Sequence, residues 1–332
     1  MILAGDIGGT NSRLALYATS GNGISLQVQQ DFLNHQFTSF PAVIEKFLAT
    51  NAHSAIDVAT LAVAGPVVGN GVTGTNLPWL VDADDIRGAA NARQVVLLND
   101  LLALAYGLHE IAASDLQTLQ SGQEDVTGNC AVVAAGTGLG EAGLLRNASR
   151  FTPFPSEGGH SDFAPTDDVQ TELFTYLAKR YGHVSYERVL SGAGIVNVYE
   201  FLRDSGHETE DAAMRERLEG AADKASVISH YGLTGQFSIC ARALEIFACV
   251  LGAEAGNVAL RMFATGGVFI GGGIAPKIAP VLHTKSFRQA FADKGRMQPF
   301  MEKIPVRLIL NQHTGLLGAA AYAVEQTTVA PV

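Results

Sequence analysis

The sequence repeats one restrictive pattern, an apolar strand that runs into a glycine-rich turn and then into a second apolar strand. The first copy is "ILAGDIGGTNSRLALY" (residues 2–17), and the second is "CAVVAAGTGLGEAGLLR" (residues 130–146). An ordinary turn needs one or two glycines, whereas a turn whose backbone amides closely approach an anion needs more. The repetition predicts two copies of one unit, each built around a glycine-rich hairpin.

The apolar periodicity along the chain predicts an α/β fold. In the first half, three strands precede a helix over 39–50, in which Val43, Phe47 and Leu48 share one face. A near-continuous apolar run over 58–65 is typical of a buried parallel strand. The same patterns predict further helices over 82–89, 101–112, 166–181, 192–204 and 234–263, and further strands over 94–100, 266–274 and 305–311. Two α/β domains with a cleft between them are the simplest architecture, and the charged stretch 203–220 is expected to form a solvated helical surface.

Composition excludes several classes of protein. The formal net charge of −10 argues against nucleic-acid binding, which needs a clustered basic surface. Cys130, Cys240 and Cys249 form no CxxC pair, so buried thiols in a reducing cytoplasm are expected. The first residues lack the basic and apolar regions of a signal peptide. Glu254 and Arg261 interrupt the most apolar region, so no membrane-spanning segment is expected.

The two hairpins are candidate phosphate-binding loops. In "GDIGGTN", Gly8 and Gly9 would let the turn approach a phosphate, and Thr10 and Asn11 would supply donors. Asp6 is placed to hold Mg²⁺ through water, because Mg²⁺ binds few carboxylates and keeps most of its waters. The alternative is an ordinary glycine hairpin with a solvated aspartate. The second hairpin repeats the arrangement with Thr137 and Gly138, and two such loops together would clamp a polyphosphate.

Two further stretches carry candidate polar side chains. Asn99 and Asp100 follow a buried strand and open a helix, a position where ligands collect in α/β sheets. The alternative for this pair is helix N-capping. Glu157 and His160 flank a Gly-Gly turn that directs both side chains toward one point, whereas Glu187 alone reads as a solvated helix-surface charge.

Other catalytic signatures are absent or incomplete in the sequence. There is no GK dipeptide, no HExxH and no GxSxG, which argues against a Walker A loop, a zincin and an α/β-hydrolase. A GxGxxG begins at Gly138, but Pro153 and Pro155 lie where a dinucleotide-binding helix would run. Glu157, His160 and Asp162 are alternative metal ligands, although nothing else completes a set of recognised spacing.

Seven motifs, in one order, give the chain a family resemblance. They are "GDIGGTNSRLALY", "LLNDLLALAYG", "GTGLGEAGLL", "PSEGGHSDFAP", "GHVSYERVLSGAGIVNVY", "GGVFIGGGIAPK" and "FRQAFADKGRM". On these motifs the chain resembles the bacterial glucokinases of the hexokinase–actin–Hsp70 superfamily along nearly its whole length. The resemblance implies two ribonuclease-H-like, actin-like α/β domains. The smaller would span 1–110 plus about 301–325, and the larger, with extra helices, would span 111–300.

The resemblance also implies a reaction, the transfer of a phosphoryl group from ATP, with Mg²⁺, to the 6-hydroxyl of glucose. Asp100 would be the general base. The implied glucose contacts are Asn99, Asp100, Glu157, His160 and Glu187, so the family position of Glu187 replaces its reading as a solvated charge. The implied nucleotide contacts are Gly5, Asp6, Ile7, Gly8, Gly9, Thr10, Asn11, Thr137, Gly138, Gly271, Gly272 and Gly273, with Asp6 near Mg²⁺.

The same resemblance implies a cytoplasmic homodimer that closes over its substrates. Small residues on two helices would allow the domains to close: Ala103, Ala105, Gly107, Gly318, Ala319 and Ala320. The chain lacks the cysteine cluster and the DNA-binding helices of a related branch, which argues against a zinc or transcriptional role. Two alternatives remain at this stage, a kinase for mannose, fructose or an N-acetylhexosamine, and a non-catalytic sugar or nucleotide sensor.

Overall fold

The computed structural model describes residues 1–20, 23–51, 55–65, 67–72, 77–123, 125–148 and 150–328. Contacts divide the chain into two units, Met1–Ala113 with Asn311–Val332, and Ser114–Leu310. By these contacts the chain returns to the first unit at Asn311, about ten residues later than the position near 301 that was expected from the sequence. The reason is β14 (Val306–Ile309), which pairs with β13 (Gly267–Gly271) and β9 (Leu116–Gln120) inside the second unit.

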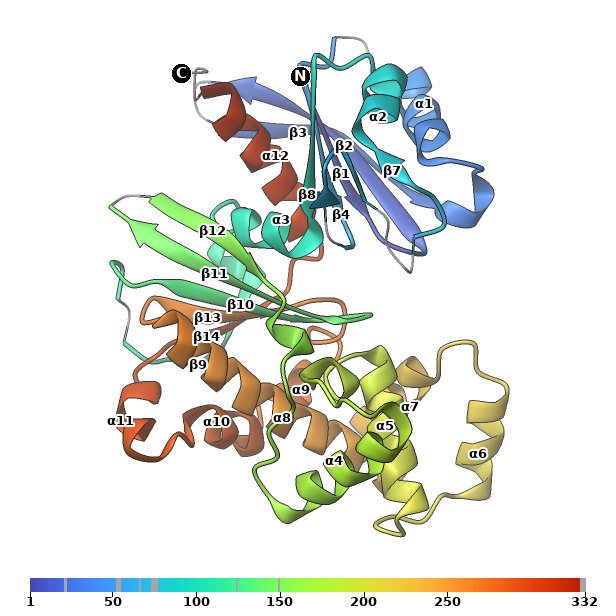
Figure 1. The fold of residues 1–332 in the computed structure, drawn as a ribbon, viewed down its shortest axis with the longest axis vertical. Helices are drawn as coiled ribbons and strands as arrows, with labels where there is room; N and C mark the ends of the chain where they lie inside the picture. Colours follow the sequence, from blue (N-terminus) through green and yellow to red (C-terminus); the bar gives the residue numbers. More distant parts are fainter. Residues whose placement is uncertain are drawn as a thin grey trace. The chain divides into compact units, whose positions relative to one another are not determined.

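Unit 1 is a five-stranded sheet with helices on both faces (Figure 1). The strand order is β3-β2-β1-β4-β8. The strands are β1 (Ile2–Ile7), β2 (Asn11–Ser20), β3 (Gly23–Leu33), β4 (Val58–Val63) and β8 (Gln94–Asn99). β1 pairs antiparallel with β2 and parallel with β4, and β4 pairs parallel with β8. The carboxyl ends of β1, β4 and β8 therefore meet at one edge of the sheet.

Alternating side chains on the strands of unit 1 build two cores. Leu3 and Ile7 of β1 pack with Phe40, Ile44 and other residues beneath α1 (Phe40–Asn51) and α2 (Ala83–Ala90). Ile2 and Ala4 of the same strand pack against α3 (Asp100–Gly107) and α12 (Thr314–Thr328) on the other face. Because successive side chains of β1 point to opposite faces of the sheet, this one strand contributes to both cores.

Two helices of unit 1 pack unusually closely. A Cβ added at Gly318 would lie 1.7 Å from the carbonyl oxygen of Ala103, and one added at Gly107 would lie 2.0 Å from that of Thr314. Ala103, Ala105, Ala319 and Ala320 are all fully buried. The small residues singled out in the sequence therefore mediate close packing of α3 on α12, while their role in closure stays a prediction. The helix expected over 101–112 is shorter than predicted, since α3 ends at Gly107.

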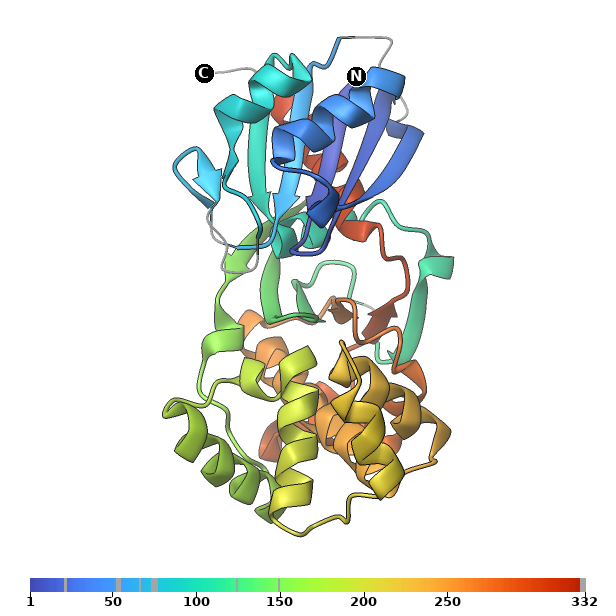
Figure 2. The same cartoon turned by 90° about the vertical axis from the view of Figure 1, so that its right-hand side faces the viewer.

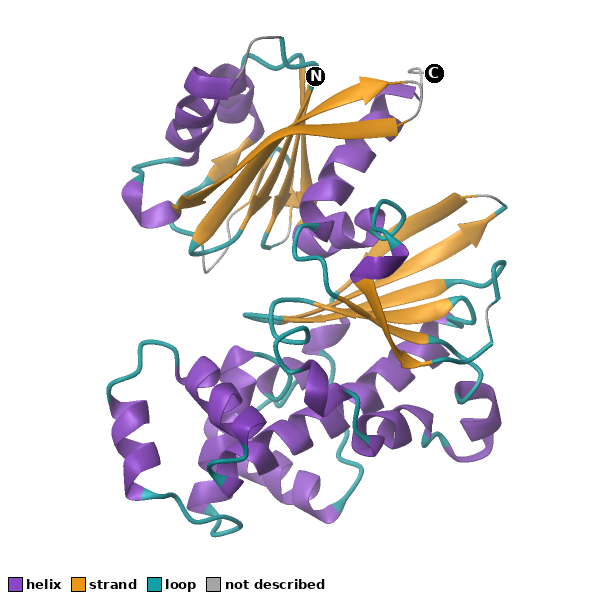
Figure 3. Ribbon diagram, turned by 180° about the vertical axis from the view of Figure 1, so that it is seen from behind, coloured by secondary structure: helices purple, strands orange, loops and turns teal. Residues whose placement is uncertain are grey.

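Unit 2 has a six-stranded sheet of order β12-β11-β10-β13-β14-β9 (Figure 3). Its first hairpin comprises β10 (Cys130–Ala135) and β11 (Leu139–Asn147), and β12 (Arg150–Ser156) continues it. The long helix α8 (Ser238–Met262) packs against β10 and β13. α8 is long and apolar enough to cross a membrane, but 78% of its apolar window is buried inside the structure, as in the core helix of a globular domain.

The remaining helices of unit 2 pack on α8 directly or through one another (Figure 2). They are α4 (Asp168–Tyr181), α5 (Gly192–Asp204), α6 (Ala212–Glu219), α7 (Lys224–Thr234), α9 (Ala279–Leu282), α10 (Lys285–Ala292) and α11 (Gln298–Met301). In the charged stretch 203–220 only the end of α5 and α6 are helical, and α7 and α9 to α11 were not expected from the sequence. α9 to α11 are short, and in α7 only Ile228 is buried, so the apolar periodicity of all four is weak in the sequence.

Several smaller elements complete the two units. Unit 1 contains a three-stranded sheet of β5 (Val67–Val68), β6 (Gly71–Val72) and β7 (Val81–Asp82), which the sequence analysis missed. Short 3₁₀ helices are η1 (Asn34–Gln36), η2 (Ala113–Asp115), η3 (Gly158–His160), η4 (Tyr186–Arg188) and η5 (Gly295–Met297). η3 and η4 matter most here, because they carry candidate site residues.

Candidate active site

The first glycine-rich hairpin joins β1 to β2 and is held from behind by Asn34. The backbone N–H of Gly8 donates to the carbonyl of Asn11 at 3.0 Å, which closes the turn. The side-chain amide of Asn34, which is almost fully buried, donates to the carbonyls of Gly8 at 2.7 Å and Gly9 at 3.0 Å. The Ser12 hydroxyl donates to Oδ1 of Asn34 at 2.8 Å and fixes the amide. Asn34 thus determines the shape of this turn, and the sequence analysis missed it because it lies in a short polar segment after β3.

Two residues predicted to contact a nucleotide face the core of unit 1. Ile7 is fully buried, and a Cβ on Gly5 would lie 2.5 Å from Cδ2 of Leu61. Thr10 and Asn11 are exposed. Only the backbone of Gly5 and Ile7 is therefore a candidate for ligand contact, whereas Thr10 and Asn11 offer side chains as well.

Asp6 lies beside this turn, at the carboxyl end of β1. Nη1 of Arg13 is 3.7 Å from its carboxylate, and Arg13 also donates to Asp31 through Nε at 3.2 Å. Burial raises the pKa of Asp6, while the positive charges of Arg13 and His313 oppose the rise. A carboxylate in this environment is stabilised by a nearby cation, because the cation compensates for lost hydration.

The donor set around Asp6 fits Mg²⁺ carried by a phosphate ligand. Carboxylate oxygen is a hard donor, and 28% of this side chain is exposed, which leaves room for intervening water. Within the described ranges, no group of three or more His, Cys, Asp or Glu side chains is arranged to hold a metal ion. A single, partly exposed carboxylate would leave most coordination positions of such an ion to water or to oxygens of a bound ligand.

Asn99 and Asp100 lie where β8 passes into α3. Oδ1 of Asn99 accepts hydrogen bonds from the backbone N–H groups of Leu101 at 3.0 Å and Leu102 at 3.3 Å. The capping alternative raised for this pair thus holds for Asn99. Asp100 is exposed, and its Oδ1 accepts from the N–H of Leu101 at 2.9 Å. Cα pairing places Ile7 beside Val63 and Val63 beside Asn99, so the Asp6 turn and the Asn99–Asp100 step share one sheet edge.

The second glycine-rich hairpin is held by a carboxylate instead of an amide. The N–H of Gly136 donates to the carbonyl of Gly138 at 2.8 Å. Oε2 of Glu187 accepts from the N–H of Leu139 at 3.0 Å, and it would lie 2.4 Å from a Cβ added at Gly138. A side chain at position 138 would therefore displace the Glu187 carboxylate from this position. Thr137, at the tip, is exposed.

A third glycine turn follows β13 and packs on this hairpin. Gly272 has φ +85°, and a Cβ there would lie 2.2 Å from the carbonyl oxygen of Ala135. Ile274 donates its N–H to that carbonyl at 3.1 Å. Nothing lies within 4 Å of a Cβ built on Gly273, so that face of the turn is open backbone.

The turn at η3 brings Glu157 and His160 together, as their spacing predicted. Nε2 of His160 is 4.0 Å from Oε2 of Glu157, and 61% and 78% of the two side chains are exposed. Gly159 packs on β11, since a Cβ there would lie 2.0 Å from the carbonyl oxygen of Leu139. Leu139 is also the residue that binds Glu187, so η3 and η4 meet at the start of β11. Asp162, the third member of the alternative metal set, instead pairs with Nε2 of His183 at 2.8 Å.

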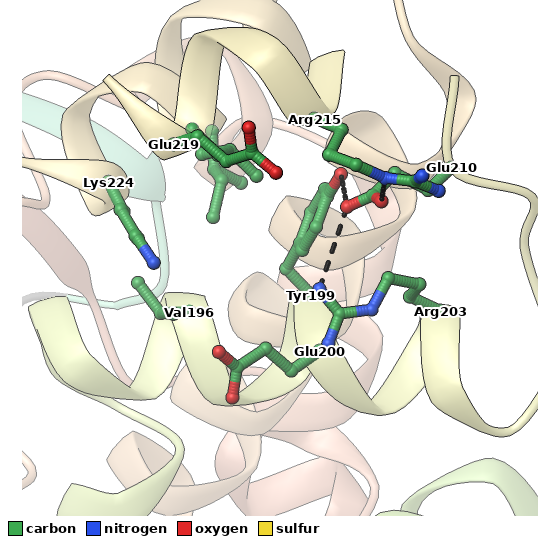
Figure 4. Close-up of a pocket in the computed structure, with 10 residues that line it drawn as sticks. Val196, Tyr199, Glu200, Arg203, Glu210, Arg215, Glu219 and Lys224 are labelled. Carbon is green, nitrogen blue, oxygen red and sulfur yellow. Dashed lines mark hydrogen bonds and ion pairs between the residues drawn. The ribbon is translucent and has the colours of Figure 1, made fainter. Parts of the chain in front are cut away.

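A cavity of about 300 Å³ lies elsewhere in unit 2, among α5, α6 and α7 (Figure 4). Glu210 accepts from Nε of Arg215 at 2.7 Å and from the Tyr199 hydroxyl at 3.1 Å, and Arg203 lies 3.6 Å away. None of the candidate site residues lines this cavity. Because its arginines are already paired with carboxylates, we assign it no ligand.

Comparison with known proteins identifies similar chains over the full length. A model of the family described as glucokinase matches residues 3–326. The chain is 37% identical to a glucokinase of Nostoc sp., over 97% of this chain and 98% of that one.

Solved structures agree with the sequence comparison. A glucokinase from an Antarctic psychrotroph is 34% identical, with a TM-score of 0.84 and 98% of each chain covered. A ROK family glucokinase from Streptomyces griseus, solved in complex with glucose and AMPPNP, is 19% identical, with a TM-score of 0.66 over 98% of this chain and 99% of that one. The predicted fold class, two α/β domains of the ribonuclease-H-like, actin-like kind, is confirmed.

Proposed function

The chain belongs to the glucokinase family and phosphorylates glucose, and on that premise we propose how its residues divide the reaction. ATP is the proposed phosphate donor, and the 6-hydroxyl of glucose is the proposed acceptor. The hydroxyl oxygen forms a bond to the γ-phosphorus, the bond from that phosphorus to the β–γ bridging oxygen breaks, and ADP leaves. Asp100 accepts the hydroxyl proton. The exposed carboxylate at the first residue of α3 is the observation that carries this assignment.

Asp100 needs little more than correct placement for this role. Phosphoryl transfer has a loose transition state, so positioning and charge neutralisation supply most of the acceleration. Asn99 fixes the start of α3 through its cap, and this fixes the backbone of Asp100. We propose that Asn99 also contacts the sugar through its amide, which lies 3.3 Å from the carbonyl of Gly65.

Unit 2 supplies the remaining proposed sugar contacts. Glu157, His160 and Glu187 converge at the start of β11. Carboxylates suit sugar hydroxyls, because each accepts from two hydroxyls and a charged acceptor strengthens the bond. Glu187 already uses Oε2 on the N–H of Leu139, which orients the carboxylate for a hydroxyl at its other oxygen.

The glycine turns are the proposed nucleotide contacts. The turns at Gly8–Asn11 and Thr137–Gly138 would bind phosphates. Gly271–Gly273 would contact adenosine, because no atom lies within 4 Å of a Cβ built on Gly273 and the backbone there is accessible. Asp6 would hold Mg²⁺ through water. When bound, that ion neutralises charge on the transferring phosphoryl group. We further propose a cytoplasmic location and a homodimer, the latter testable by sedimentation over a range of concentrations.

The replacement Asp100→Asn tests the proposed base. We expect turnover to fall by roughly 10²–10⁴-fold, because the amide cannot accept the proton, while glucose affinity stays within about threefold. Asp85→Asn is the matched control, since Asp85 is an exposed acid in the first turn of α2. Turnover should be measured as ADP release with glucose, mannose, fructose, N-acetylglucosamine or no sugar, with identification of the product. Normal turnover in Asp100→Asn would exclude the base, and release with another sugar alone would exclude glucose as the substrate.

A further inference from the structure

Two carboxyl groups of unit 2 lie buried against each other, and the proposed mechanism uses neither. Glu141 of β11 is 1% exposed, and Glu254 of α8 is fully buried. The two side chains are hydrogen-bonded to each other, where the sheet meets α8. A carboxyl–carboxyl hydrogen bond requires a proton on one partner. Oε1 of Glu141 has no further hydrogen-bond partner among the residues that the structure describes.

The cation bound directly to the pair can neutralise one of the two carboxylates but not both. The guanidinium of Arg261 binds Oε1 of Glu254, and Nδ2 of Asn257 donates to Oε2 of Glu254 at 2.8 Å. The ammonium of Lys294 donates to the carbonyl of Ala253 at 2.9 Å, and burial lowers its pKa. With Arg261 neutralising Glu254, ionisation of Glu141 would add an uncompensated buried charge, which is costly.

Each member of the pair contacts a segment that carries sugar-binding residues. A Cβ on Gly158 would lie 1.9 Å from Oε2 of Glu141, so this carboxyl supports η3 directly. Glu254 is linked to the hydroxyl of Tyr186, the first residue of η4, through Asn257, whose Nδ2 donates to Oε2 of Glu254 at 2.8 Å. Asn257 donates to the same hydroxyl at 3.0 Å. Glu157 immediately precedes Gly158, and Glu187 immediately follows Tyr186.

We propose that the Glu141–Glu254 pair is a positioning device. The proton that the two buried carboxyl groups share holds η3 and η4 in place relative to each other, and this placement sets the affinity for the sugar. This inference rests on the proposed sugar contacts of Glu157, His160 and Glu187. Glu141 and Glu254 touch no substrate in this account. They act through the backbone of Gly158 and the ring of Tyr186.

The device predicts a direction of pH dependence. Burial, followed by the charge of Glu254, raises the pKa of Glu141 from 4.5 to about 8. Below that pH the pair keeps its proton and its hydrogen bond. As the pH rises through about 8, two carboxylates face each other with Arg261 as the directly bound cation, and they repel. KM for glucose should therefore rise above this pH, while kcat changes less.

Two replacements of Glu141 test the proposal against a matched control. The side chain introduced by Glu141→Gln has nearly the same size and can donate a hydrogen bond to Glu254, but it does not ionise in this pH range. Glu141→Leu removes the hydrogen bond. Glu216→Gln, on the exposed face of α6, is the control. KM for glucose, KM for ATP and kcat should be measured between about pH 6 and about pH 9.5.

The expected results separate positioning from general destabilisation. Glu141→Gln should have a near-normal KM for glucose near neutral pH and should lose the alkaline rise that the unmodified protein and Glu216→Gln show. Glu141→Leu should raise KM for glucose at least roughly fivefold at every pH, with KM for ATP nearly unchanged. The proposal is overturned if Glu141→Gln retains the alkaline rise, or if Glu141→Leu leaves KM for glucose unchanged.

A second readout does not depend on catalysis. Amide hydrogen exchange in the substrate-free protein should be faster at residues 157–161 and 186–189 in Glu141→Leu, and unchanged at 84–90 in unit 1. Unchanged exchange at 157–161 would overturn the positioning role even if the enzyme phosphorylates glucose. Faster exchange there, in a protein that phosphorylates no sugar, would support the positioning device and refute the proposed function.

Discussion

The two units share a sheet topology but fix their glycine turns differently. Unit 1 has the order β3-β2-β1-β4-β8, and unit 2 repeats it as β12-β11-β10-β13-β14, with β9 added at the edge. In both, an antiparallel hairpin leads into parallel pairing. In unit 1 the amide of Asn34 holds the turn carbonyls, whereas in unit 2 the carboxylate of Glu187 holds a turn N–H. One backbone pattern therefore serves two tasks, according to the side chain packed against it.

The units also differ in the acid beside the turn. Asp6 and Ala134 each stand one residue before the end of a six-residue strand. Asp6 pairs in register with Arg13, and Ala134 pairs with Gly140. Unit 1 thus carries a carboxylate where unit 2 carries a methyl group. The proposed cation-binding carboxylate therefore lies in unit 1 and has no counterpart at the equivalent position of unit 2, and the following variants test how the two turns differ.

The largest expected effect comes from Asp6→Asn. Turnover should fall by roughly 10²–10³-fold, because the charge that compensates a bound cation is lost, and KM for glucose should stay within about threefold. Asp31→Asn is the matched control, since Asp31 also pairs with Arg13 but is exposed. Turnover measured over a range of Mg²⁺ concentrations checks this. Equal losses in the two variants would mean that Arg13, and not the cation, explains the effect.

The next effect concerns stability, at two glycines of α12. Gly318→Ala should destabilise unit 1 by about 1–3 kcal/mol, because the new methyl meets the carbonyl of Ala103. Gly315→Ala, on the same helix with nothing within 4 Å, should be neutral or stabilise by up to about 1 kcal/mol. Urea unfolding followed by circular dichroism measures both. Similar stabilities for the two variants would contradict the close packing of α3 on α12.

A third pair of variants compares the turns directly. Gly138→Ala should raise KM for glucose by roughly tenfold, because the methyl displaces the Glu187 carboxylate. Gly8→Ala meets only the carbonyl of Asn11, at 3.4 Å, so it should alter KM for ATP and leave KM for glucose unchanged. Initial-rate kinetics with each substrate varied measure both KM values. A rise in KM for glucose in Gly8→Ala but not in Gly138→Ala would contradict the proposal that the second turn positions Glu187 for the sugar.

The smallest effect is expected at the N-cap of α5. The Ser191 hydroxyl accepts from the N–H of Gly194 at 3.0 Å and donates to the carbonyl of Glu187 at 2.8 Å. Ser191→Ala should cost about 1 kcal/mol of stability and raise KM for glucose by about twofold, while Ser191→Thr should retain most of both. Thermal unfolding and glucose titration measure these changes. A KM rise as large as that of Gly138→Ala would show that the cap, and not the turn, controls Glu187.

The sequence predicted what depends on residues close together in the chain. Both hairpins, the strand over 58–63, the helices α1 and α5, and the convergence of Glu157 and His160 all follow from local periodicity, glycine placement or spacing. The short helices α9 to α11 and the sheet β5–β7 did not, because two to eight residues carry too little periodicity.

Only the tertiary structure revealed the partners that complete the site. Asn34 reaches back to Gly8, Glu187 reaches Leu139, and Glu254 reaches Glu141, each across a long stretch of sequence. Taken alone in the sequence, Glu187 reads as a solvated helix-surface charge, and nothing in the sequence indicates that Glu141 is buried. The physical reason is that backbone conformation follows from neighbouring residues, whereas a buried polar group is satisfied by whichever distant side chain the packing of the sheet and helices brings within reach.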